Sequence, residues 1–335
     1  MQRLGPGAGL PDFLARHGRS IDEVLHGLPV TASDLRPDAF MPLPLVIEIF
    51  ERAAAATQCG DIGFQLGKQQ SFPALGAVGQ LMSYSQTLGE ALADYITVQI
   101  SNSSAGSAYL HRLGDDYAFG FGLYGPGFRS SAHIYDISLA VGINIIRDLT
   151  RGAVIPLEAL LIRLVPDDPA PYREHARCPV RFNQNQCCLI LSARDLDFPL
   201  KTYDREAHGK LLGALQARLK RDHSGVADQV RHAMRPLMLT GKTSLDDVAA
   251  HLGLHPRTLE RRLDAWGTTF GAIKDSVRFA VARELLLITE LSASDIAASL
   301  GYATPSAFVH AFRRWANVTP THWRREARAQ GAGSE

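Results

Sequence analysis

The spacing of apolar residues divides the chain into a mixed first part and a helical second part. In the first part, helical spacing predicts five helices, over 20–26, 43–57, 74–83, 88–100 and 131–149. Alternating apolar residues between turn residues predict five strands, over 106–113, 117–124, 160–165, 180–182 and 187–191. We therefore expect an α+β domain at residues 1–203.

The second part reads as helical throughout. A charged helical pattern over 204–225 is expected to be a connector, and 226–330 an all-α domain. Within that domain, apolar residues keep a helical spacing through Phe270–Thr289 and predict one long amphipathic helix.

A short repeat lies within the helical part. Val248–Leu254 matches Ile296–Tyr302 position for position, 48 residues later. Each copy has a small alanine, a leucine and a turn glycine at matching positions, and two apolar residues one helical turn apart after the turn. In the first copy these are Ala249, Leu252, Gly253, Leu259 and Leu263. In the second copy they are Ala297, Leu300, Gly301, Phe308 and Phe312. A helix-turn-helix unit needs these residue types, because its helices cross closely and its turn needs a positive φ. The sequence predicts two such units, joined rigidly by the long helix.

The free face of each second helix is the expected DNA contact. Arginine can bind guanine edges in the major groove, and glutamate can accept from cytosine. The residues expected to contact DNA are Arg257, Thr258, Glu260, Arg261 and Arg262 in the first unit, and Thr304, Ser306, Val309, His310 and Arg313 in the second. Arg262 and Arg314 are expected to meet phosphates or carboxylates. Two recognition helices on one chain would read two successive major-groove segments.

The charge distribution agrees with this interpretation. The whole chain carries a formal net charge of +1. Residues 226–330 hold 14 Lys or Arg against 10 Asp or Glu, a net charge of +4, which leaves −3 for the rest. A basic C-terminal part behind a mildly acidic N-terminal part fits a nucleic-acid-binding module joined to another domain.

The C-terminal motifs resemble the DNA-binding domain of the AraC/XylS family. The resemblance runs over roughly Val226–Arg328, through the two repeat copies and segments that include Gly267-Thr268-x-Phe270, Phe312-Arg313-Arg314-Trp315 and Thr319-Pro320-x-x-Trp323-Arg324. Where the family often has glycine, this chain has Asn317, which also tolerates a positive φ. The resemblance implies sequence-specific control of promoters, usually switched by an effector bound to the N-terminal domain.

The N-terminal part resembles the α+β effector domain of the AraC-type subgroup named for arabinose binding. That name does not make arabinose the ligand. The helices before Ile100 argue against the cupin-like β-barrel of the sugar-binding members. Polar residues on the helix over 131–149 are expected to line a small effector pocket: His133, Tyr135, Asp136, Asn144 and Arg147.

Other chemistry finds little support in the sequence. The four cysteines lack metal-ligand spacing, so no metal or cofactor is expected and buried packing is the favoured role, with a redox sensor at Cys187-Cys188 as the alternative. The glycines of Gly120–Gly125 have dinucleotide-fingerprint spacing, but no helix follows them directly. No catalytic motif is recognised, so an enzyme is not expected.

Three functions remain in competition. The first is a transcription regulator controlled by a small molecule. The second is a constitutive regulator whose N-terminal domain only dimerises, and the third is an enzyme with a DNA-binding tail. The expected partners are promoter DNA, RNA polymerase, a small-molecule effector and a second copy of the chain. No apolar run suits a membrane span and the first twenty residues lack a signal-peptide pattern, so a cytoplasmic location is expected.

Overall fold

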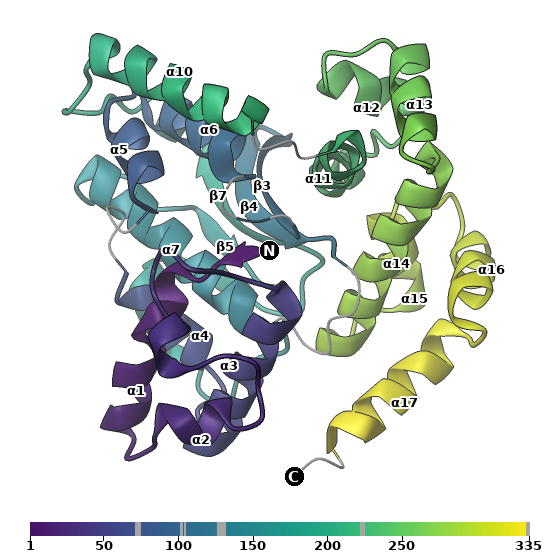
Figure 1. Cartoon of the computed structure of the whole chain (residues 1–335), viewed down its shortest axis with the longest axis horizontal. Coiled ribbons are helices and arrows are strands. Elements are labelled where there is room, and N and C mark those ends of the chain that lie inside the picture. Colours follow the sequence, from purple (N-terminus) through teal and green to yellow (C-terminus); the bar gives the residue numbers. More distant parts are fainter. Residues whose placement is uncertain (71–74, 101–102, 104, 126–131, 222–224, 333–335) are drawn as a thin grey trace.

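The computed structural model describes residues 1–70, 75–100, 103, 105–125, 132–221 and 225–332. It shows an α+β N-terminal domain beside an all-α C-terminal domain with two helix-turn-helix units and a long joining helix, which confirms the predicted fold class (Figure 1). Among the described helices, none is both long and apolar enough to cross a membrane.

A five-stranded sheet forms the centre of the N-terminal domain, in the order β3-β4-β7-β5-β6. The strands are β3 (Gly106–Leu113), β4 (Asp116–Leu123), β5 (Glu158–Leu160), β6 (Val180–Arg181) and β7 (Cys187–Ser192). The strand predicted over 160–165 is wrong. It ends at Leu160, because the chain then turns Arg163 inward to the buried carboxylate of Asp136. Two short strands, β1 (Gln2–Arg3) and β2 (Phe40–Met41), pair outside this sheet.

Helices cover one face of the sheet. The longest is α7 (Ala132–Thr150), which packs on β4 and β7. Around it lie α1 (Leu10–Arg16), α2 (Ile21–Leu25), α3 (Leu43–Thr57), α4 (Ile62–Lys68), α5 (Ala77–Ser83), α6 (Leu88–Gln99), α8 (Ala170–Ala176) and α9 (Ala193–Leu196), with 3₁₀ turns at Gly5–Gly9 and Ala32–Asp34. The helix predicted over 43–57 is confirmed at both ends. Predicted positions 74 and 131 lie outside the described residues.

The charged helix α10 (Arg205–Arg221) lies along α5 and α6 of the N-terminal domain. The His208 ring nitrogen Nε2 is 2.7 Å from Oδ2 of Asp94, which ties the start of this helix to α6. The helical prediction for the connector is confirmed, and the helix packs on the first domain instead of spanning open solvent (Figure 1).

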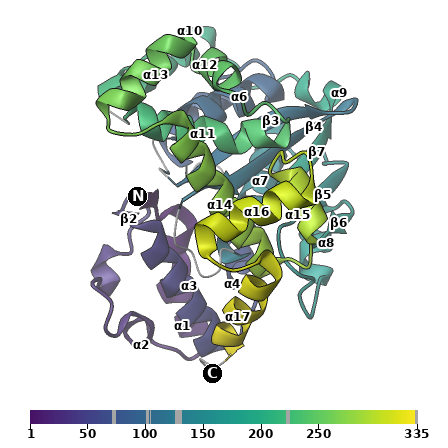
Figure 2. The ribbon, with the colours of Figure 1, turned by 90° about the vertical axis from the view of Figure 1, so that its right-hand side faces the viewer.

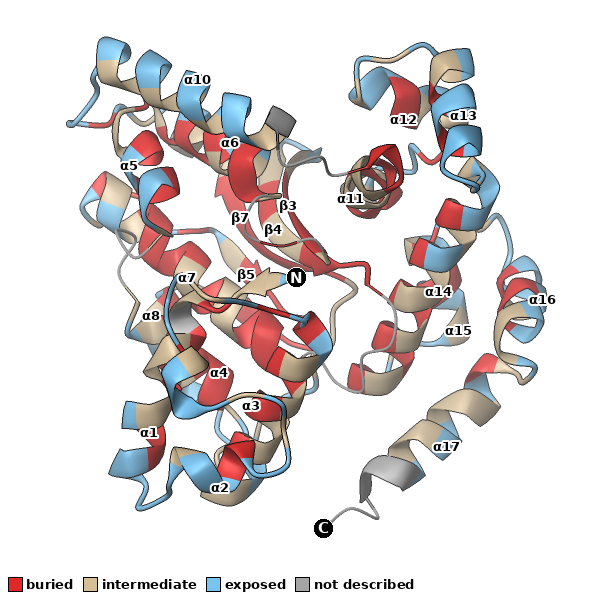
Figure 3. Ribbon diagram, viewed as in Figure 1, coloured by how far each residue is buried: buried red, intermediate tan, exposed pale blue. Residues whose placement is uncertain are grey.

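The C-terminal domain covers the other face of the sheet with its first helix, α11 (Val226–Leu239). It continues through α12 (Leu245–His251), α13 (Pro256–Ala265), α14 (Phe270–Ile288), α15 (Ala293–Ser299), α16 (Pro305–Ala316) and α17 (Pro320–Ala332). Burial is dense on the sheet, α7 and α11, whereas α10, α13 and α16 present exposed faces (Figure 3). The sheet therefore lies between its own helices and the DNA-binding domain.

Candidate nucleic-acid interface and ligand cavity

Two helix-turn-helix units, α12–α13 and α15–α16, occupy the positions predicted by the repeat. Each first helix begins with a reciprocal serine–aspartate cap, Ser244 with Asp247 and Ser292 with Asp295. The turn glycines Gly253 and Gly301 have φ values of 65° and 70°. The capping pairs are also 48 residues apart, so the repeat begins upstream of the segment found by sequence matching.

The apolar pair in each second helix is buried as predicted. Leu259 and Leu263 hold α13, and Phe308 and Phe312 hold α16. His255 and Thr304 cap these helices, with side chains that accept from the backbone N–H groups of Arg257 and Ala307. Local sequence thus fixes where each recognition helix begins, and its buried pair fixes which face remains outside.

The residues expected to contact DNA lie on that outer face. Arg257, Glu260, Arg261 and Arg262 are exposed on α13, and Thr258 is half-buried. On the second unit Thr304, Ser306, His310 and Arg313 are exposed, and Val309 is half-buried. Both recognition helices lie on the side of the molecule turned away from the N-terminal domain (Figures 1 and 2).

The joining helix α14 is attached to both units by side chains. The Lys274 ammonium donates to the carbonyl of Thr243, 2.7 Å away, just before α12. The Arg278 guanidinium donates to the carbonyl of Gly301 at 3.2 Å and lies 4.4 Å from the centre of the Tyr302 ring. Arg314 of α16 pairs with Asp275 at 2.6 Å, so this arginine meets a carboxylate. These contacts hold both units on one rigid spacer.

Asn317 ends α16 in the left-handed conformation, with φ of 60°. Its backbone N–H donates to the carbonyl of Arg313. The prediction that asparagine preserves this turn is confirmed.

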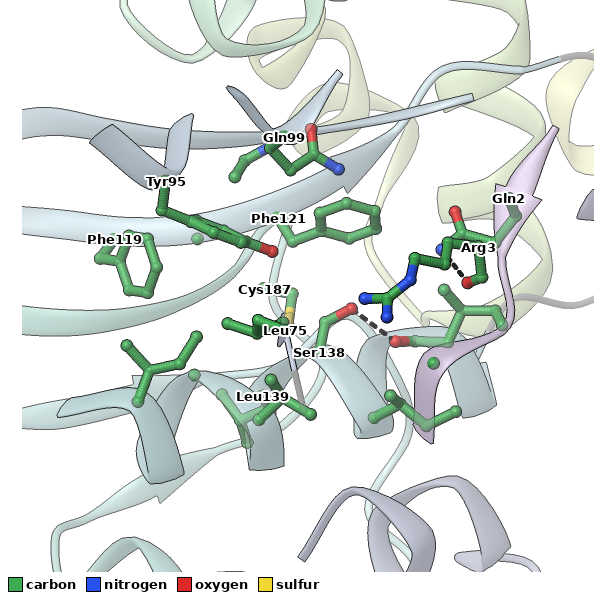
Figure 4. A pocket seen from close by; sticks show the side chains of 18 of the residues that line it. Gln2, Arg3, Leu75, Tyr95, Gln99, Phe119, Phe121, Ser138, Leu139 and Cys187 are labelled. Carbon is green, nitrogen blue, oxygen red and sulfur yellow. Dashed lines mark hydrogen bonds between the residues drawn. The ribbon is translucent and has the colours of Figure 1, made fainter. Parts of the chain in front are cut away.

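A cavity of about 130 Å³ lies inside the N-terminal domain. Its walls come from α7, from the face of β4 and β7 that α7 covers, from α6 and from β1 (Figure 4). The lining is mainly apolar and includes Phe50, Phe119, Phe121, Ile134 and Ile145. The cavity is lined by α7, the helix expected to carry the effector site, but by other residues of that helix.

The five residues expected to form an effector pocket do not line this cavity. Burial lowers the pKa of His133 to about 4, and its Nε2 is 3.9 Å from Glu51. Asp136 is buried against Arg163 and accepts from the Tyr172 hydroxyl at 3.0 Å. Asp136, Arg163 and Tyr172 form one buried cluster, whereas His133 Nδ1 and Asp136 Oδ1 are buried with no hydrogen-bond partner among the described residues.

The remaining members of that set also have internal partners. The Asn144 amide donates to the carbonyls at the end of α4, the shortest contact being 2.6 Å to Gln70, and Arg147 donates to Asn144. The Tyr135 hydroxyl donates to the carboxylate of Glu284 at 2.7 Å and accepts from the N–H of Leu123 at 3.2 Å. Glu284 belongs to α14, so Tyr135 connects the two domains.

A second contact between the domains involves Arg235 of α11. Its side chain is 1 % exposed, and its Nε and Nη2 have no hydrogen-bond partner among the described residues. A Cβ atom on Gly122 would fall 2.7 Å from the Arg235 Nε, so the arginine lies directly on the glycine. Burial and the nearby Glu284 carboxylate raise the pKa of Tyr135, while the positive charge of Arg235 opposes that rise. The pKa of Tyr135 therefore depends on two charges at the domain interface, the Glu284 carboxylate and the Arg235 guanidinium.

Comparison with known proteins agrees with this geometry. The arabinose-binding domain of AraC transcription regulators (N-terminal) matches residues 18–200, and a helix-turn-helix domain matches residues 248–326. The chain belongs to the AraC family of transcription regulators. Its AraC-family relatives are transcriptional regulators, and the protein is a DNA-binding regulator and not an enzyme.

Two AraC-family relatives extend beyond the DNA-binding domain. The regulator VirS of Mycobacterium tuberculosis is 29 % identical over 301 residues, covering 86 % of this chain and 85 % of VirS. The regulator VqsM of Pseudomonas aeruginosa is 28 % identical over 196 residues, covering 54 % and 56 %. Among solved structures, the regulator CdpR from Pseudomonas aeruginosa aligns over 94 % of this chain and 98 % of its own, with 24 % identity and a TM-score of 0.45.

Two minor sequence signals have structural explanations in this AraC-family chain. Cys187 and Cys188 are both buried on opposite faces of β7, and burial raises the pKa of Cys188 to about 12, so neither is a ready thiolate. Gly120 and Gly122 face Tyr109 and Arg235, where larger residues would collide. These glycines are therefore explained by close packing against the sheet and not by binding of a dinucleotide. Among the described residues, no group of three metal-ligating side chains was found.

Proposed function

We propose that the protein binds promoter DNA through α13 and α16, reading two successive major-groove segments with one chain. The observation that supports this is the exposed outer face of both recognition helices, held on α14. Arg257 and Arg261 are assigned to base or phosphate contact in one half of the site, and Ser306 and His310 in the other.

Single alanine substitutions test the assignment. Arg257→Ala or Arg261→Ala is expected to lower affinity by about 5- to 140-fold, equivalent to about 1–3 kcal/mol, and to relax sequence preference in one half-site. Ser306→Ala and His310→Ala are expected to change protection in the other half. Footprinting and gel-shift titration at fixed salt measure both effects.

Arg194→Ala on the exposed end of α9 provides a matched control, because it removes an arginine far from both recognition helices. Its binding should equal that of the wild type. If all four recognition-helix variants leave the footprint unchanged, α13 and α16 do not read the site.

We further propose that a small molecule in the N-terminal cavity controls this binding. Residues of α7 and β4 line the cavity, and the same two elements contact the DNA-binding domain. Ile134 lines the cavity while its neighbour Tyr135 bonds to Glu284. Phe121 lines the cavity, while the side chain of Arg235 packs on its neighbour Gly122. A ligand that displaces α7 or β4 would therefore change the domain contacts.

Tyr135→Phe tests the connection. It removes the hydroxyl that bonds to Glu284 and leaves the ring in place, so the expected result is faster hydrogen exchange in α11 and α14, with a folded N-terminal domain. Tyr117→Phe is the matched control, because Tyr117 lies near the start of β4, at the opposite end from Leu123 and this contact. Unchanged exchange in both helices would show that the hydrogen bond does not hold the domains together.

We propose the remaining features of the regulator on the same basis. The chain divides at 1–203, 204–225 and 226–330, acts in the cytoplasm and contacts RNA polymerase at its promoters. A homodimer is the proposed assembly, which light scattering of the full chain tests directly. A constitutive regulator is the alternative, and a cavity that binds nothing would favour it.

A further inference from the structure

The cavity has the size and surface of a site for a small apolar body. Its volume is about 130 Å³, close to the ~150 Å³ of a hydrocarbon-lined cavity that accepts benzene. The apolar side chains include Val46 and Phe50 of α3, Phe119 and Phe121 of β4, Ile134, Leu139 and Ile145 of α7, and Leu189 of β7. A body of about six carbon atoms would fill this part.

A sugar does not suit this lining. Nearly every carbon of a sugar carries a hydroxyl group, and a hydroxyl buried without a hydrogen bond costs about 1–3 kcal/mol. The walls formed by α3, β4 and β7 offer rings and aliphatic chains to most of the ligand surface. The polar groups are few and come from β1, α6 and α7.

Those polar groups are mainly donors. The Arg3 guanidinium reaches into the cavity toward the hydroxyl of Ser138, and the Tyr95 hydroxyl enters from α6 (Figure 4). The Tyr95 hydroxyl has no hydrogen-bond partner among the described residues, and burial raises its pKa to about 12, so it remains a donor at neutral pH. Gln99 accepts from the N–H of Ala108 at 3.4 Å, which leaves its amide NH₂ to donate.

Two acceptors balance this set. The Ser138 hydroxyl donates to the carbonyl of Ile134 at 2.7 Å, so toward the cavity its oxygen can only accept. The Gln2 side-chain oxygen is buried without a hydrogen-bond partner, because its amide nitrogen already donates to the carbonyl of Arg3 at 2.9 Å. A water molecule beside a bound anion would supply the missing donor. The donors otherwise favour a ligand with a negatively charged, acceptor-rich head.

We propose that this cavity binds a small aliphatic carboxylic acid, with its hydrocarbon body among the rings of β4 and α3 and its carboxylate at Arg3. The inference rests on the proposed effector control and specifies its ligand. A carboxylic acid is ionised at neutral pH, and a guanidinium can bind both carboxylate oxygens. Ser138 and Tyr95 lie where they can orient the head or the first carbons of the chain.

Calorimetric titration of the full chain with cyclohexanecarboxylate, cyclohexylmethanol and L-arabinose tests the proposal. Saturable binding is expected for the carboxylate, with affinity at least tenfold above the alcohol and no binding of the sugar. Arg3→Met should weaken carboxylate binding by about 10- to 100-fold, as for the loss of a charge-assisted hydrogen bond. Arg19→Met, at an exposed arginine in the same region, should bind like the wild type.

Ser138→Leu gives an independent check, because it fills the cavity without removing the charge. It should abolish binding while DNA affinity without ligand is retained, which also shows that the variant folds. Equal affinity for the alcohol, preferred binding of the sugar, or no binding of the carboxylate would overturn the proposal. If the carboxylate binds but DNA affinity does not change, the ligand assignment stands and effector control fails.

Discussion

At the scale of single residues, the contact between Gly122 and Arg235 shows how strongly one side chain can depend on the absence of another. Arg235 is among the largest fully buried side chains of the described residues, and it lies where a Cβ of residue 122 would be. The Tyr109 ring packs on Gly120 in the same way, because a Cβ atom on Gly120 would lie 2.5 Å from that ring. Small residues on one face of β4 thus make room for Arg235 of α11 and for Tyr109 of the neighbouring strand β3.

Gly122→Ala should weaken the interface. The added methyl group collides with the Arg235 side chain, and overpacking of this kind costs about 1–3 kcal/mol. Limited proteolysis between α10 and α11 and the melting temperature measure the change. Gly213→Ala, in α10 with open space around its Cα, is the control and should raise stability slightly through helix propensity. A Gly122→Ala protein as resistant and as stable as the wild type would contradict the packing argument.

At the scale of elements, α14 acts as a spacer that fixes both helix-turn-helix units. Arg278→Met should loosen the second unit, because it removes the donor to the Gly301 carbonyl and the charge over Tyr302 while keeping an apolar stem. The expected result is a loss of about 1–2 kcal/mol in stability and weaker protection of one half-site, although this residue is not assigned to DNA. Arg278→Lys should recover part of both. Full protection by Arg278→Met would show that the spacer does not need this contact.

The elements were predictable where their information is local. Capping residues, turn glycines and apolar spacing are short-range signals, so the sequence predicted the bounds of α14 to within one residue and the existence and buried faces of both recognition helices. Pairing with distant segments is not local. The inward turn of Arg163 toward Asp136 ends β5 early, and nothing in residues 160–165 announces that partner.

The cavity was predictable only in part for the same reason. Polar residues on α7 were expected to face a ligand, but Asp136 and Asn144 bind groups of α8 and α4 that sequence alone does not bring near. The residues that line the cavity, such as Ile137 and Ser138, look like ordinary helix residues until β1 and α6 are placed against them. The position of Arg3 in the cavity could not be predicted from the sequence, because it depends on the path that the first few residues take past α7.

At the scale of the whole molecule, acid should separate the domains. His232 of α11 is half-buried against the Tyr124 hydroxyl, 3.2 Å from its Nδ1, and burial, with a smaller effect of His251, lowers its pKa to about 4. A lowered pKa favours docking while the ring is neutral. This contribution is fully present above pH 6.5 and is lost as pH falls toward 4, with a maximum of about 3 kcal/mol.

Small-angle scattering and hydrogen exchange of α11 between pH 7 and pH 4.5 would follow this separation. His232→Asn keeps an acceptor near Tyr124 but does not titrate in this range, so its docking should depend less on pH. His133 and His175 also have pKa values lowered to about 4 by burial, so unfolding of the N-terminal domain must be monitored separately. Identical pH profiles for His232→Asn and the wild type would remove His232 as the cause.

The position of α11 has a consequence for building hybrid regulators. This helix precedes the matched helix-turn-helix segment 248–326 and packs on α12, α13 and α14, yet it also covers β3 and β4 of the effector half. A chimera that imports a foreign DNA-binding half from Val226 onward would replace α11 with a helix whose side chains do not match Gly122 and the neighbouring surface of β3 and β4. One joined after Leu239 would keep that surface covered, and it is the junction at which a new promoter specificity could be grafted onto an intact sensor.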